Sequence, residues 1–121
     1  MRESQMVTGK GREDGGGSRM LQFFFLGFVR IHILHHACEG PIYGTGIKEE
    51  LARHGYNLSP GTLYPILHGL EEHGYLASRG EVVEGKLRRY YLATPKGREA
   101  LAEAKEKIRE LVEELLARVG T

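Results

Sequence analysis

Glycine and proline recur along this chain of 121 residues and limit how far any one helix or strand can run. Gly40-Pro41 ends an apolar segment, because glycine closes a helix and proline does not continue it. Ser59-Pro60 and Thr94-Pro95 are typical of helix starts, with a capping hydroxyl before proline at the first helical position. The segment that Ser59 begins ends at Gly74. These breaks predict several short elements packed into one small domain.

The interval between Gly74 and Thr94 has strand character, because Tyr90, Tyr91 and Leu92 favour strands and Glu84-Gly85 supplies a turn. A short turn between two helices, followed at once by a hairpin, is the order of a winged helix-turn-helix. We therefore predict a mainly α fold with a small β-hairpin. The predicted helices are 20–38, 43–54, 60–73 and 94–119, and the strands are 75–82 and 87–93. The predicted parts are a disordered tail (1–19), a winged domain (20–93) and a C-terminal dimerisation helix (94–121).

Two of the predicted helices carry more apolar surface than one small domain can bury. The helix at 20–38 is apolar around nearly its whole circumference, and such a helix must be buried on most sides. The helix at 94–119 carries an apolar stripe close to a heptad pattern, with charged residues opposite. Both features predict a homodimer. The predicted dimerisation residues are Phe24, Phe25, Phe28, Leu101, Ile108, Leu111, Val112 and Leu115.

The helix after Ser59 has two different faces. Leu63, Leu67 and their neighbours at helical spacing form an apolar side, whereas Thr62, Tyr64 and His68 lie on the other side. A recognition helix needs small or hydrogen-bonding side chains at its exposed N-terminal end to enter the major groove of DNA. The alternative is that Ser59 is only a well-made cap and Tyr64 packs on a neighbour.

The predicted hairpin carries a compact basic group in an otherwise balanced chain, whose formal net charge is +1. Alternation places Lys86 and Arg88 on one face and Arg89 on the other. Such a tip suits phosphate or minor-groove contact, although charges also blunt an exposed edge strand. In the preceding helix, Tyr43, Thr45 and Lys48 are expected to hold backbone phosphates. The predicted partner is double-stranded DNA.

Composition argues against several other classes of protein. The apolar run 21–34 is interrupted by Arg30 and His32 and is too short to span a bilayer, so no membrane partner is expected. One cysteine, Cys38, fits a reducing cytosol, and we expect a cytoplasmic location. Glu71 and Glu72 point apart on a helix, and no nucleophile has a base at a fitting spacing. We therefore expect no enzyme activity, no cofactor and no metal.

Three blocks of this sequence resemble the PadR family of bacterial and archaeal transcriptional regulators. They are 40–47 (GPIYGTGI), 59–67 (SPGTLYPIL) and 88–92 (RRYYL), and the resemblance covers residues 20–119. It implies a dimer with a winged domain, a single C-terminal helix of the short-tailed subtype, and repression of nearby genes. It also implies backbone contacts from Tyr43 and Lys48, groove contacts from Thr62, Tyr64 and His68, and wing contacts from Lys86 and Arg88. No Trp is present to stack a planar effector, so any effector stays unknown.

The sequence leaves three hypotheses open. The first is a dimeric regulator, a repressor that reads a palindromic operator. The second is a winged-helix module that binds protein and not DNA, which the near-neutral charge keeps open. The third is a metal- or redox-responsive regulator, because His32 and His36 lie four residues apart on one helix face with Cys38 nearby.

Overall fold

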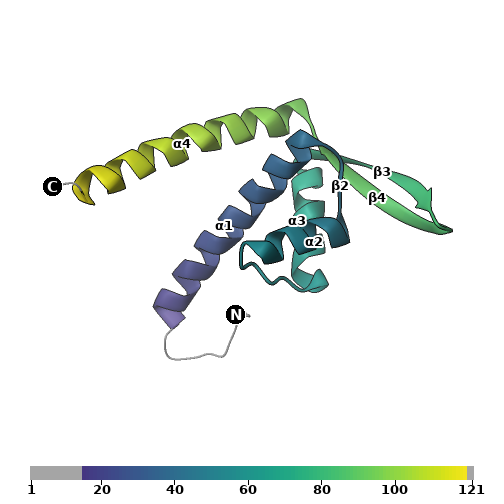
Figure 1. Ribbon diagram of the computed structural model, residues 1–121, viewed down its shortest axis with the longest axis horizontal. Coiled ribbons are helices and arrows are strands. Elements are labelled where there is room, and N and C mark those ends of the chain that lie inside the picture. The colour runs from purple at the N-terminus through teal and green to yellow at the C-terminus, as the bar shows by residue number, and fades with distance from the viewer. Residues whose placement is uncertain (1–14, 120–121) are drawn as a thin grey trace.

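The structure is a computed structural model that describes the backbone of residues 15–119 and the side chains of residues 19–117 (Figure 1). Its first helix, α1, extends over Gly15–Glu39, so residues 15–19 belong to a helix and not to the predicted tail. Lengthening a formed helix gains one hydrogen bond per residue, which lets it continue upstream of the apolar segment. The remainder of the predicted tail, residues 1–14, lies outside the described residues.

The remaining helices follow the predicted order. Helices α2 (Gly44–Arg53) and α3 (Pro60–Glu72) flank a short turn, and α4 (Pro95–Val119) closes the chain. Strands β3 (Leu76–Val83) and β4 (Lys86–Ala93) form the hairpin between α3 and α4. The mainly α winged helix-turn-helix is therefore confirmed. In Figure 1, α4 extends away from the winged domain on the side opposite to the hairpin.

A third strand, β2 (Ile42–Tyr43), joins the hairpin and was not predicted. The sheet order is β2-β4-β3, and Tyr43 pairs with Tyr90 in antiparallel register. The sequence predicted that Tyr43 begins the helix at 43–54. In the structure Tyr43 lies in strand β2, directly before α2. The pairing partner is about fifty residues away in the chain, and two residues are too few to show strand alternation. The strand fixes the start of α2 against the wing.

The hairpin turn has the geometry that its sequence predicts. Glu84 and Gly85 both have positive φ, 53° and 79°, as a two-residue hairpin turn requires. Glutamate is seldom found in this region, whereas glycine enters it freely. Strand β3 ends at Val83 and β4 begins at Lys86, so each strand extends one residue further toward the turn than predicted.

The core lies where α1, α3 and the sheet meet. The predicted inner face of α3 is buried, and Leu63 and Leu67 have no exposed surface. Ile33 and Val29 of α1 and Tyr91 of β4 complete this cluster. Burial of each such side chain contributes about 1.5–3 kcal/mol, so the core holds α3 rigidly and leaves its other side to solvent.

The two predicted helix caps behave differently. Thr94 caps α4 as predicted, because its Oγ1 accepts from the Gly97 N–H at 3.0 Å. Ser59 occupies the cap position of α3, but its Oγ makes no capping bond and donates to Thr62 Oγ1 at 3.3 Å. The Ser59 carbonyl instead accepts from the Leu63 N–H at 2.9 Å. The predicted side-chain cap at Ser59 is therefore wrong.

The start of α4 is fastened to the end of α3. Thr94 Oγ1 also donates to the Gly74 carbonyl at 2.5 Å, and Lys96 Nζ donates to the His73 carbonyl at 2.8 Å. Gly97 lies so close to the Tyr75 carbonyl that a β-carbon would clash with it. The direction in which α4 leaves the domain is thus coupled to the position of α3.

One helical segment, Arg19–Glu39, is long and apolar enough to cross a membrane by length and composition alone. Core helices of soluble proteins pass the same test. Val29, Ile33 and Ala37 on this helix are buried against the winged domain, where lipid could not reach them. We assign the C-terminal half of α1 to the core of the fold.

Candidate nucleic-acid interface

Helix α3 presents a polar face to solvent beside the hairpin. Thr62, Tyr64 and His68 are exposed on the side opposite to the buried leucines, as predicted. Pro65 lies inside the helix, so the Gly61 carbonyl lacks the usual N–H partner four residues on. The helix nevertheless begins at Pro60. Its N-terminal end therefore presents the Gly61 carbonyl, which lacks that bond, beside these side chains.

A groove of about 670 Å³ lies between α3 and the hairpin. It brings together the N-terminal end of α2, the exposed face of α3 and the wing. Seven of the ten residues predicted to contact DNA line it, namely Tyr43, Thr45, Tyr64, His68, Lys86, Arg88 and Arg89. The other three, Lys48, Ser59 and Thr62, are exposed outside the groove.

Arg88 is held against the face of an aromatic ring. Its guanidinium carbon lies 4.2 Å from the centroid of the Tyr43 ring, which in turn meets Tyr90 edge-on at 5.6 Å. A cation over such a ring is attracted by the negative face of the π system. A hydrogen bond with Tyr90 raises the pKa of Arg88, so the guanidinium stays charged. Strand β2 is what places Tyr43 here.

Arg89 points to the other face of the hairpin and is held by a polar chain. Its Nη1 donates to Ser78 Oγ at 3.2 Å, and Ser78 Oγ donates to Glu71 Oε2 at 2.6 Å. Glu71 belongs to α3, so this chain ties the wing to the proposed reading helix. In the same strand as Arg89, burial raises the pKa of Tyr91, so its phenol stays neutral.

Two glycines at the start of α2 make room for tyrosine rings. The hydroxyl and ring of Tyr64 occupy the space that a β-carbon on Gly44 would need, and the Tyr43 ring lies against Gly46. Gly44 thus lets Tyr64 lie across α2 into the groove, and Gly46 leaves room for the Tyr43 ring.

Replacing Gly44 by Ala is expected to lower the free energy of unfolding by about 1–3 kcal/mol, the usual cost of overpacking. The added methyl group must displace Tyr64. Urea unfolding measures the change. In a Tyr64→Ala background the same substitution is expected to cost almost nothing, because the clash is gone.

Gly69→Ala is the matched control for Gly44→Ala. Gly69 also lies in a helix, but a β-carbon there meets nothing within 4 Å. Alanine is the better helix former, so this variant should gain up to about 1 kcal/mol. An equal loss for Gly44→Ala with and without Tyr64 would contradict the steric explanation.

Comparison with known proteins identifies the family. The profile of the family described as "Transcriptional regulator PadR-like family" matches residues 33–103, more than half of the chain. This protein is a PadR-like regulator. The resemblance seen in the sequence is thereby confirmed, and the chain is a transcriptional regulator and not an enzyme.

Individual PadR-like relatives agree with this assignment. "Transcriptional regulator Rv3488" of Mycobacterium tuberculosis is 53% identical over 88 residues, which cover 73% of this chain and 82% of the relative. The crystal structure of a PadR family regulator from Eggerthella lenta is 30% identical, with a TM-score of 0.73, and the match covers 89% and 96% of the two chains. A PadR-like regulator from Bacillus cereus is 28% identical, with a TM-score of 0.64, over 74% and 92%.

Proposed function

We propose that this PadR-like regulator is a homodimeric repressor that binds a palindromic operator in double-stranded DNA in the cytoplasm. The observation that carries the proposal is the groove between α3 and the hairpin, which is lined by Tyr64 and His68 of α3 and by Lys86, Arg88 and Arg89 of the hairpin. An exposed helix such as α3 can enter the major groove of DNA, and the cations on the wing can contact backbone phosphates.

Exposed apolar side chains on two helices support a dimer. Phe24 and Phe25 on α1 and Leu111, Val112 and Leu115 on α4 are all exposed, and Phe28 and Ile108 are half-buried. Helix α4 has 25 residues, which span roughly 37 Å, and from residue 111 to 117 every side chain is exposed. Exposed apolar side chains that gather on a soluble protein are typical of interfaces.

The proposed interface differs from the predicted one at one residue. Leu101 is buried in the core of its own domain and has almost no surface left for a partner. It lies near the start of α4, where the helix still packs on α1. The partner is therefore expected to cover the part of α4 that begins near Ile108, together with the N-terminal half of α1.

A gel shift with genomic fragments that include the protein's own promoter tests DNA binding. We expect saturable binding to a fragment with two half-sites about one helical turn apart, because a twofold dimer presents two reading helices. The oligomeric state is verified by light scattering in the same buffer. A verified dimer that binds no fragment at low salt would exclude the proposal.

The second candidate is a winged-helix module that binds protein and not DNA. Two observations favour it: the formal net charge is only +1, and the wing tip exposes the cross-strand apolar pair Val82 and Leu87. Apolar side chains at an exposed hairpin tip are typical of protein contacts. The response of DNA binding to salt, argued below, separates the two candidates.

A further inference from the structure

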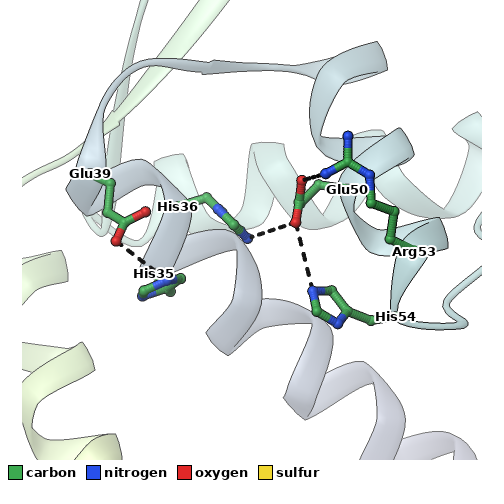
Figure 2. A network of polar contacts seen from close by, with 6 residues as sticks. All are labelled: His35, His36, Glu39, Glu50, Arg53 and His54. Carbon is green, nitrogen blue, oxygen red and sulfur yellow. Dashed lines mark hydrogen bonds and ion pairs between the residues drawn. The ribbon is translucent and has the colours of Figure 1, made fainter.

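A second polar cluster lies between α1 and α2, outside the groove (Figure 2). His36 reaches across from α1, while Glu50 and His54 come from α2 and its C-cap. The Nε2 atom of His36 lies 3.8 Å from Glu50 Oε2, and the Nε2 atom of His54 lies 3.7 Å from the same oxygen. Two imidazoles from different helices thus converge on one carboxylate oxygen.

The carboxylate is oriented by a neighbouring cation. Arg53 Nη1 donates to the other oxygen, Glu50 Oε1, at 2.5 Å (Figure 2). This bond fixes the plane of the carboxylate and leaves Oε2 facing the two histidines. Outer-shell bonds of this kind orient carboxylate ligands in metal sites.

We propose that His36, Glu50 and His54 form a binding site for one divalent transition-metal ion of the Zn²⁺, Co²⁺ and Ni²⁺ class. Imidazole nitrogen and carboxylate oxygen are the donors that these ions prefer. Metal–ligand distances of about 2.0–2.2 Å place tetrahedral ligand atoms about 3.4 Å apart. The separations of the two imidazole nitrogens from Glu50 Oε2 need to shorten by only a few tenths of an ångström. The ligand atoms of the three residues do not all lie within 4.8 Å of one another, so the two imidazoles must also rotate toward each other as the ion binds.

The site combines access with preorganisation. The side chains of His36, Glu50 and His54 are 24%, 28% and 47% exposed, so an ion can enter and water can complete its coordination. His32 stacks on the His54 ring with centroids 4.8 Å apart, and Tyr56 flanks His32. Burial lowers the pKa of His32, with smaller contributions from His54, His36 and His35. The stacked His32 ring restrains the orientation of the His54 ring.

A competing set shares His36 but is less well built. The ligand atoms of His35, His36 and Glu39 lie within 4.8 Å of one another, all on α1. His35 is 3.6 Å from Glu39 and is about as exposed as His54, but the Glu39 side chain is 65% exposed, against 28% for Glu50. Glu50 is already oriented by Arg53, whereas the order of Glu39 must be gained at the moment of binding, which costs side-chain entropy. We therefore assign the ion to the set that joins two helices.

This assignment revises the hypothesis drawn from the sequence. Of the three residues considered there, only His36 belongs to the site. Cys38 is partly buried against the core, and His32 acts through His54. An ion here would join α1, with its exposed Phe24 and Phe25, to α2 of the helix-turn-helix. That regulatory consequence rests on the proposed function, whereas the metal site itself does not.

Titration of the tag-free full-length protein with Co²⁺ tests the site without DNA. We expect one Co²⁺ per chain, with visible absorption bands from an ion in nitrogen and oxygen coordination, and displacement of Co²⁺ by Zn²⁺. His36→Gln, Glu50→Gln and His54→Gln should each weaken binding by more than about tenfold, since even outer-shell changes cost that much. His35→Gln is the matched control and should bind Co²⁺ like the unmodified chain.

Two outcomes would overturn the proposal. One is the absence of saturable Co²⁺ binding by the unmodified protein. The other is loss of binding in His35→Gln with binding unchanged in His54→Gln, which would assign the ion to the set on α1. His54 is half-exposed, so its variant is expected to fold, and circular dichroism checks this. Zn²⁺ should also raise the thermal midpoint of the unmodified chain but not of His54→Gln.

Discussion

Leu111→Asp is expected to leave the protein monomeric at concentrations where the unmodified chain is dimeric. Leu111 is 52% exposed on α4 and lies on the same helix face as Ile108 and Leu115. In the proposed dimer this face is buried, and burying an unpaired carboxylate in an apolar seam costs several kcal/mol. In the isolated chain the aspartate stays in solvent and costs little. Light scattering coupled to gel filtration measures the mass directly.

Ala117→Asp is the control, because it adds the same charge to the same helix on the opposite face. It should remain dimeric. Loss of the dimer should also weaken operator binding steeply, since a monomer contacts one half-site and loses the linked second contact. Circular dichroism and urea unfolding should show that the domain core of the Leu111→Asp monomer is still folded. An intact Leu111→Asp dimer would show that α4 does not form the interface.

Proline and glycine made the ends of helices α3 and α4 predictable from the sequence. Proline at the first helical position and glycine just beyond the last turn are chemical constraints on the backbone. Pro60 and Pro95 are the first residues of α3 and α4, and Gly74 follows the last residue of α3, Glu72, by two positions. The helical spacing of Leu63, Ile66 and Leu67 correctly predicted which side of α3 is buried. These properties depend only on residues that are close in the chain.

What the sequence did not reveal depends on distant partners. Strand β2 exists because Ile42 and Tyr43 pair with β4, and no pattern within two residues signals that. Ser59 and Thr94 precede proline in the same way, yet only Thr94 makes a capping bond, because its hydroxyl is already placed by Gly74. The metal hypothesis drawn from the sequence named only residues of α1, because helical spacing shows which residues are neighbours on one helix. It does not show that Glu50 and His54 of the next helix lie beside His36.

The groove was predicted in its members and not in its construction. Tyr64, His68 and the basic wing were chosen for their chemistry, and they do meet in one groove. The contacts that position them came from the structure. Tyr43 reaches Arg88 only through β2, and Tyr64 enters the groove only because Gly44 has no side chain.

Arg88→Ala combined with Arg89→Ala is expected to make operator binding much less sensitive to salt. Each phosphate contact that is lost shallows the slope of log K against log salt concentration by roughly 0.9, so the double variant should lose roughly 1.8. Gel shifts or fluorescence anisotropy across a salt series give the slope. Lys105→Ala with Lys107→Ala is the matched control, because it removes the same two charges from exposed positions on α4. Its slope should not change.

The single variants make the same experiment sharper, because the two arginines lie on opposite faces of β4. Arg88 stacks on Tyr43, and Arg89 bonds to Ser78, which is linked to α3. If the hairpin straddles the backbone of the duplex, each single variant should shallow the slope by roughly 0.9. A slope unchanged in the double variant would mean that the cations hold no phosphate. In that case the exposed pair Val82 and Leu87 becomes the better guide, and the hairpin is a surface for protein.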